Sequence, residues 1–264
     1  MSDAGANINL VRLSVCVLAY NDEAILARCL GVLDFADEVV VVVDAKTTDG
    51  TEKIAREMAT AVSVHGYVGD VEQKRHAIGL AQNEWVLLLD SDEVVSAGLA
   101  DRIGAFLANP GEMTGAEVNR LTFHLGRWIR HGDFYPDWKL RLFRKHAANV
   151  VGLNPHGRVE VAGGTARLDG DLEHFSYRDI SDQLERIQRF STDGAAALHA
   201  DGRKFRMWDL CLRPPLRFLR SYLLKRGFLD GTAGFFIAVA TGFHVFLKYA
   251  KLWEAERRDR TSGP

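Results

Sequence analysis

The chain has few cysteines and no glycine-rich phosphate-binding loop. Its 264 residues contain three cysteines, Cys16, Cys29 and Cys211, without the spacing of metal ligands, so we expect reduced thiols and no disulfide framework. Neither a Walker loop nor a G-x-G-x-x-G motif occurs, which argues against the usual ATPase and dinucleotide-binding sites. A net charge of −2 gives no sign of a nucleic-acid-binding protein. Residues 1–9 lack a basic segment followed by an apolar core, so we expect a flexible tail and a cytoplasmic protein.

The first half of the chain alternates short apolar runs with amphipathic segments. Runs rich in β-branched residues predict strands at 13–18, 38–43, 61–65 and 84–89. The segments between and after them predict helices at 23–33, 51–58, 71–81 and 96–107, with Thr48 or Asp49 capping the second helix. This alternation predicts an α/β fold with a mainly parallel, doubly wound sheet. No internal repeat is evident.

The alternation stops after Pro110. Strands are predicted at 116–123, 139–143, 160–161 and 165–168, followed by a helix at 180–198. Between the first two strands lies a basic loop with four aromatic residues: Trp128, Phe134, Tyr135 and Trp138. These rings can stack on sugar rings or pack a lid onto the sheet, and the sequence does not choose between the two.

Acidic and amide side chains follow several of the predicted strands. Asp90-Ser91-Asp92 directly follows the strand at 84–89, Asp44 follows the second strand, and residues 19–23 follow the first. The carboxyl ends of parallel strands meet at one edge of a sheet, where such sheets bind ligands. Two adjacent carboxylates can cap a helix, but they also suit a hard divalent cation shared with substrate phosphates. Without a phosphate-binding loop, a metal ion is the expected means of neutralising a diphosphate.

The C-terminal segment is basic and amphipathic. Arg213, Arg217 and Arg220 alternate with leucine and aromatic residues, and residues 231–247 contain no charged side chain apart from histidine. Seventeen residues lie at the lower limit for a membrane span. We therefore expect attachment to an anionic membrane surface rather than a span. Burial in a dimer or against the rest of the chain is the alternative.

Several motifs together resemble glycosyltransferase family 2, whose members have the GT-A fold. In the first half they are Ala19-Tyr20-Asn21-Asp22-Glu23, Val43-Asp44, Thr48-Asp49-Gly50-Thr51, Gln73-Lys74-Arg75 and Leu89-Asp90-Ser91-Asp92-Glu93. In the second half, the stretches 126–132, 135–144, 174–179 and 246–251 resemble the branch that includes lipopolysaccharide-core β-1,4-glucosyltransferases. The resemblance covers roughly residues 13–253. It implies a GT-A sheet of the Rossmann-like, mainly parallel type, to which the C-terminal pattern adds a helical extension that we expect to associate with membranes.

The resemblance also implies roles for individual residues. The positions expected to bind the nucleotide sugar are Ala19, Tyr20, Asn21, Glu23, Asp44, Lys74 (or its neighbour Arg75), Asp90 and Ser91. Asp44 would face the uracil or its ribose, and Asp92 would bind Mg²⁺ or Mn²⁺. The turn after Asp44 departs from the family pattern of a small residue and serine, because it reads Ala45-Lys46-Thr47. Lys46 can contact a phosphate there or be a solvated turn lysine.

The resemblance implies an inverting transferase, in which an acceptor hydroxyl displaces the nucleoside diphosphate in one step. Such a transfer requires a base that takes the proton of the acceptor hydroxyl. The candidates are Asp137, Glu160 and, behind them, His156. An ion pair within a loop, with Arg141 or Arg158, is the alternative reading of these acids.

The sequence thus predicts a metal-dependent enzyme that moves a hexose, glucose from UDP-glucose in the first place, onto an inner-core sugar of lipopolysaccharide. A different lipid-linked or polysaccharide acceptor is the alternative, and a non-catalytic sugar-nucleotide-binding or membrane-scaffold protein is a third reading. The predicted divisions are a tail at 1–9, a catalytic domain at 10–205 with halves meeting near residue 110, and a helical extension at 206–264. The expected partners are a UDP-sugar, a lipid-anchored glycan and the inner leaflet of the cytoplasmic membrane, with a possible homodimer.

Overall fold

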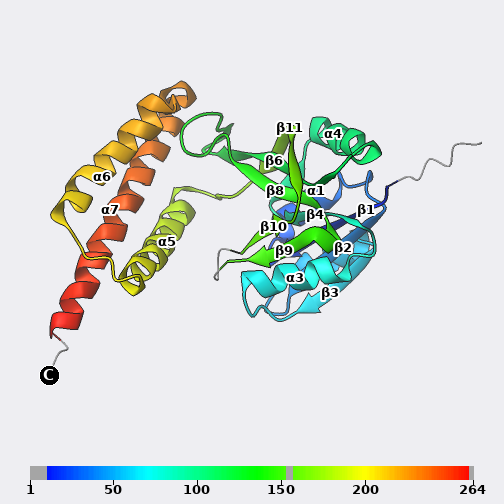
Figure 1. Ribbon diagram of the computed structural model, residues 1–264, viewed down its shortest axis with the longest axis horizontal. Helices are drawn as coiled ribbons and strands as arrows, with labels where there is room; N and C mark the ends of the chain where they lie inside the picture. The colour runs from blue at the N-terminus through cyan, green and yellow to red at the C-terminus, as the bar shows by residue number, and fades with distance from the viewer. Residues whose placement is uncertain (1–10, 153–156, 262–264) are drawn as a thin grey trace, which may run out of the picture. The chain divides into compact units, whose positions relative to one another are not determined.

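A computed structural model describes residues 11–152 and 157–261 (Figure 1). Contacts divide the chain into two units, which are described separately. The first unit comprises residues 1–120 and 138–174, and the second comprises residues 121–137 and 175–264. The sequence analysis predicted a domain boundary between residues 205 and 206. The two contact-based units do not test that boundary, so it stays a prediction.

The first unit contains a mixed sheet whose central strands are parallel. In sequence order the parallel strands are β1 (Leu13–Ala19), β2 (Glu38–Asp44), β3 (Ala61–His65) and β4 (Trp85–Asp90), and they lie in the order β3-β2-β1-β4. The sheet continues beyond β4 with β8 (Trp138–Arg144), β6 (Met113–His124), β11 (Gly164–His174) and β5 (Glu93–Val95). β8 pairs antiparallel with β4, and β11 pairs antiparallel with β5. The predicted α/β fold with a mostly parallel central sheet is confirmed.

Burial explains why the central strands are continuous apolar runs. Helices α1 (Glu23–Leu30), α2 (Thr51–Met58), α3 (Asp70–Leu80) and α4 (Ala97–Ala108) belong to this unit. A core cluster joins Cys16, Val40, Val42 and Leu88 from the parallel strands with Phe143 of β8. A strand buried on both faces has no solvent side and so shows no alternation of polar residues.

Several sequence-based boundaries differ from the structure, among them the end of α1, the N-cap of α2 and the length of β11, which extends to residue 174 rather than 168. The first helix ends at Leu30 rather than at residue 33. The N–H of Gly31, the residue that follows the helix, still donates to the Ala27 carbonyl. Gly50, not Thr48 or Asp49, is the N-cap of α2, and Asp49 instead accepts hydrogen bonds from the N–H and hydroxyl of Thr51. The cap prediction was wrong by one or two residues, and the loop before α2 is held by tertiary contacts described below.

Short elements complete the first unit. They are η1 (Lys145–Ala147), β9 (Ala148–Val151) and β10 (Arg158–Val161), and β9 and β10 form a separate antiparallel pair.

The second unit is built mainly from helices. Its elements are β7 (Arg127–Trp128), α5 (Ile180–Ala200), α6 (Met207–Leu219), η2 (Arg220–Leu224, a π-helical turn), η3 (Gly227–Asp230) and α7 (Gly231–Thr261). The long helix α7 packs against both α5 and α6 (Figure 1). Gly234 is required at the start of α7, because a Cβ there would lie 1.8 Å from the carbonyl oxygen of Gly227.

The buried carboxylate of Asp230 fixes the entry to α7. One of its oxygens accepts hydrogen bonds from the backbone N–H groups of Arg130 (3.1 Å) and His131 (2.8 Å). By length and composition alone, the helical stretch Gly227–Asp259 could cross a membrane, and 39% of its most apolar window is buried.

Candidate functional site

The ends of β1, β2 and β4 lie side by side at one edge of the parallel sheet. Register pairs Ala19 with Val43 and Leu18 with Asp90. The residues after β1, the end of β2 at Asp44 and the end of β4 at Asp90 therefore meet where ligands bind in sheets of this kind.

Side chains of the loop after β1 hold the loop after β2. The Asn21 amide oxygen accepts a hydrogen bond from the Thr48 N–H (2.8 Å), and a Glu23 carboxylate oxygen accepts one from the Gly50 N–H (2.9 Å). In return, the Glu23 N–H donates to Asp49 (3.1 Å). Asn21 has a φ of 52°, a left-handed conformation that asparagine tolerates better than most residues. Asn21 and Glu23 thus position the rim of the site.

Asp22 connects this rim to the end of β4. Its carboxylate accepts hydrogen bonds from the Ser91 hydroxyl and the Tyr20 N–H. Burial raises the pKa of Asp22, and the nearby charges of Asp92 and Asp49 raise it further, against the lowering effect of those two hydrogen bonds. The carboxylates of this edge are close enough to repel one another.

Asp90 and Glu93 are held by Arg141, which the sequence-based analysis considered only as a partner for a loop acid. The guanidinium of Arg141 on β8 donates to Asp90 (2.7 Å) and to Glu93 (2.5 Å). Burial alone would raise the pKa of Asp90, but the charges of Arg141 and Lys74 bring it to about 2. The side chain of Glu93 is 0% exposed, and its second oxygen accepts the Asp90 N–H. Asp90 is therefore ionised and fixed, while 39% of its side chain remains exposed.

Asp92 faces an imidazole. Its carboxylate lies 3.4 Å from Nε2 of His174, the last residue of β11. The pairing of His174 with Glu93 in the β11–β5 ladder brings this histidine to the acidic edge. Sequence analysis missed this neighbour, because no local pattern links the two positions.

Asp92 and His174 are suitable ligands for a divalent metal ion. Mn²⁺ accepts both carboxylate and imidazole, and Mg²⁺ or Mn²⁺ at phosphate sites commonly takes one or two protein ligands with the rest from water and substrate. Among the residues that the structure describes, no group of three histidine, cysteine or acidic side chains is arranged to hold a metal. The two side chains fit an ion whose coordination is completed by a diphosphate, rather than one held by the protein alone.

The other predicted nucleotide-binding residues lie around the same edge. Asp44 is buried at the end of β2, where one carboxylate oxygen accepts the N–H groups of Lys46 (3.0 Å) and Tyr67 (3.4 Å). Ala19 is buried at the end of β1, and Tyr20 is 52% exposed beside it.

Two lysines of the predicted site have defined surroundings. Lys74 on α3 is buried and donates to Asp70 (2.8 Å) and to the carbonyl of Gly157 (2.7 Å), the residue directly before β10. The side chain of Lys46 is exposed, in agreement with a solvated turn lysine.

The three candidates for the catalytic base lie in different parts of the chain. Glu160 lies on β10, and its carboxylate pairs with Arg158 at 2.7 Å in a largely exposed position. Asp137 directly precedes β8 and belongs to the second unit. His156 lies outside the described residues. All three stay predictions.

A comparison with protein families identifies the chain. The model for glycosyl transferase family 2 matches residues 14–164, which is more than half of the sequence. The chain belongs to glycosyltransferase family 2. This family 2 protein is therefore a glycosyltransferase, as its sequence motifs predicted.

Relatives cover nearly its full length. It is 29% identical to the glycosyltransferase RT0209 of Rickettsia typhi, over 94% of this chain and 89% of that protein. It is 28% identical to the lipopolysaccharide core biosynthesis glycosyltransferase LpsC of Rhizobium meliloti, over 92% of each chain.

A solved structure confirms the fold of the family 2 transferase. The mannosyltransferase PcManGT of Pyrobaculum calidifontis, solved with GDP-mannose and Mn²⁺, aligns with a TM-score of 0.53 and 17% identity. The alignment covers 92% of this chain and 87% of the mannosyltransferase.

Proposed function

We propose that this transferase moves a hexose, glucose from UDP-glucose in the first place, onto an inner-core sugar of lipopolysaccharide. The pairing of Asp92 with His174 beside the strand ends carries the metal-dependent part of the proposal. The match to LpsC over nine-tenths of both chains supports the lipopolysaccharide acceptor.

The donor would lie along the edge formed by β1, β2 and β4. One oxygen of Asp44 already accepts two backbone N–H groups, and its other oxygen has no hydrogen bond within the described residues. That oxygen can accept a hydrogen bond from the uracil or the ribose. Asp90, ionised and fixed by Arg141, can accept from a ribose hydroxyl.

The diphosphate would lie between this edge and Asp92. Asp92 and His174 would hold the cation, as Mn²⁺ is present with GDP-mannose in PcManGT. When bound, the cation would neutralise the charge that develops on the departing diphosphate. The carboxylates alone would repel that diphosphate, so the arrangement makes transfer depend on a divalent ion.

Inversion places the base on the acceptor side of the sugar. Asp137 and Glu160 are retained as equal candidates, with His156 behind them, and Glu160 would have to leave its ion pair with Arg158 to act as the base. A positioned base contributes about 10²–10⁴-fold to the rate. Replacing each acid with its amide and measuring kcat separates the two.

The C-terminal helices would hold the enzyme on the inner leaflet of the cytoplasmic membrane. α7 exposes an apolar row at helical spacing: Phe235, Val239, Phe243 and Phe246. Such a row suits a helix that lies in a membrane surface. A lipid-anchored acceptor would be concentrated at the same surface.

The test is a donor and acceptor screen with the purified full-length enzyme. UDP-, GDP- and ADP-hexoses are offered with Mn²⁺ or with EDTA, and lipopolysaccharide with a truncated core serves as the acceptor. We expect transfer from UDP-glucose with Mn²⁺ only. Equal transfer in EDTA would contradict the metal assignment, and transfer only to other lipid-linked glycans would favour the alternative acceptor.

A further inference from the structure

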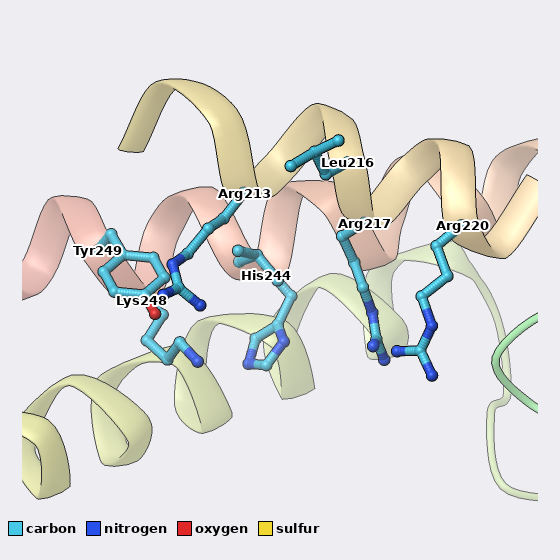
Figure 2. A pocket seen from close by; sticks show the side chains of 8 residues that line it. Arg213, Leu216, Arg217, Arg220, His244, Lys248 and Tyr249 are labelled. Carbon is cyan, nitrogen blue, oxygen red and sulfur yellow. The ribbon is translucent and has the colours of Figure 1, made fainter. Parts of the chain in front are cut away.

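A cationic pocket of about 480 Å³ lies within the second unit, between α6 and α7. Its polar lining includes Arg213, Arg217 and Arg220 from the α6 side and His244 and Lys248 from α7. In Figure 2 the three arginines point to the same side as these two side chains. No carboxylate lines the pocket among the described residues.

Helical spacing aligns the arginines. Positions 213, 217 and 220 follow one another by four and three residues, so they form a row on one face. Like charges in such a row repel one another, and nothing in helix formation favours this arrangement. A second row lies about a quarter-turn away and consists of leucines that are exposed: Leu212, Leu216, Leu219 and Leu223. The segment therefore presents cationic and apolar surfaces next to each other.

The nearby carboxylates do not balance the basic side chains. Two carboxylates are shared by four bases: Asp209 by Arg203 and Arg213, and Asp133 by Arg217 and Lys225. Within the described part of the chain, Arg220 and Lys248 have no ion pair. Six basic side chains thus face two acids, and the pocket has an excess of positive charge.

This excess of positive charge acts on the pKa values of Lys248 and His244. Burial lowers the pKa of Lys248, and the charges of Arg213 and Arg217 lower it further. Burial likewise lowers the pKa of His244, with Lys248 adding to the effect. Lys248 has lost part of its hydration, and the charge of Asp209 offsets only part of this effect. A bound anion would relieve this repulsion.

We propose that this pocket binds a phosphate group, supplied by the headgroup of an anionic lipid. Guanidinium groups match the geometry of phosphate oxygens, and an ammonium adds a point charge. The adjacent leucine row gives the acyl chains of the same lipid an apolar surface. The proposal rests on the proposed membrane attachment but not on the transfer reaction.

The test uses the full-length protein and vesicles of phosphatidylcholine with or without phosphatidic acid. The pocket variant carries Arg220→Gln and Lys248→Gln. The control variant carries Arg189→Gln and Arg206→Gln, which remove two exposed charges of the same unit that do not line the pocket. Circular dichroism melting curves establish that both variants are folded.

The two variants are expected to differ in size of effect. Loss of two charged hydrogen-bonding groups lowers partitioning onto phosphatidic acid vesicles roughly a thousandfold. Loss of two diffuse surface charges lowers it only about 25-fold. Equal losses in the two variants would overturn the proposal in favour of general attraction to an anionic surface.

Soluble probes distinguish the source of the phosphate. Isothermal titration with glycerol 3-phosphate and with inorganic phosphate is expected to give little heat compared with short-chain phosphatidic acid. Tight binding of the soluble phosphates that is lost in the pocket variant would overturn the lipid assignment. Absence of transferase activity in a protein that still binds these vesicles would count against the proposed function and leave the pocket intact.

Discussion

Replacing Arg141 with methionine tests the balance of buried charge beside the acidic edge. In the native protein the guanidinium lies between Asp90 and Glu93, and Glu93 is 0% exposed. Without Arg141, the nearest cation to Glu93 is Arg120 at 3.4 Å. Breaking a buried pair by removing one partner costs about 3–5 kcal/mol, and we expect Arg141→Met to lower the free energy of unfolding by this amount.

A double-mutant cycle separates this effect from lost packing. Glu93→Gln leaves Arg141 paired with Asp90, so its cost should be about 1–3 kcal/mol. Adding Glu93→Gln to Arg141→Met removes the buried carboxylate whose nearest cation is then Arg120, and the coupling energy should be about 1–3 kcal/mol. Urea unfolding at neutral pH, followed by circular dichroism, measures all three variants.

The matched control lies on the same strand. Arg144 pairs with the half-exposed Glu84 and lies over the Trp85 ring at 4.8 Å, so Arg144→Met should cost about 1 kcal/mol. If Arg141→Met costs no more than Arg144→Met, the charge network does not stabilise the fold as argued here.

The same substitution has a pH signature. In the native protein partial desolvation would raise the pKa of Asp90, but the charges of Arg141 and Lys74 lower it to about 2. Its ionised form therefore contributes stability above the ordinary aspartate pKa of about 3.9, and this contribution is lost as the pH falls from that value through 2. In Arg141→Met the pKa of Asp90 should move back toward its ordinary value, so the free energy of unfolding should fall less between about pH 4 and pH 2 than it does in the native protein.

Three further predictions concern the site and the thiols. Asp92→Asn should lower kcat by about 10²–10³-fold with an unchanged melting curve. The control Asp101→Asn, on the exposed face of α4, should leave kcat unchanged. Substantial turnover in Asp92→Asn would contradict the role of Asp92 as a metal ligand. His174→Ala should raise the Mn²⁺ concentration that gives half-maximal activity by about 10–100-fold, and an unchanged metal dependence would exclude His174 as a ligand. Cys211 is exposed, whereas burial raises the pKa of Cys16 to about 12 and also raises that of Cys29. One thiol in three should therefore react with a disulfide reagent before the protein unfolds. Rapid reaction of a second thiol would show that the core opens.

The parallel strands could be predicted because strands buried on both faces appear in the sequence as continuous apolar runs. Runs such as residues 39–43 and 85–89 have no charged position, and only a strand covered on both faces suits them. The convergence of Asp44 and Asp90 then follows from parallel pairing alone. β5 was missed, because three residues carry no periodicity and its formation depends on pairing with β11.

The partners of the acidic side chains could not be predicted in the same way. Arg141 and His174 come to the edge through β8 and β11, which are added to the sheet by antiparallel pairing far along the chain. Pairing register, not sequence spacing, decides which side chain faces Asp90 or Asp92. A motif thus identifies the acids, but not the groups that set their charge.

The loop after β2 shows how a departure from the family pattern can be accommodated. Asn21 and Glu23 hold the backbone N–H groups of Thr48 and Gly50, so the shape of this loop depends on acceptors from the β1 side. The exposed side chain of Lys46 takes no part in these hydrogen bonds, because only its backbone N–H donates, to Asp44. A lysine can therefore replace the serine of the family pattern in this turn without displacing Asp44, and the nucleotide edge keeps its carboxylate.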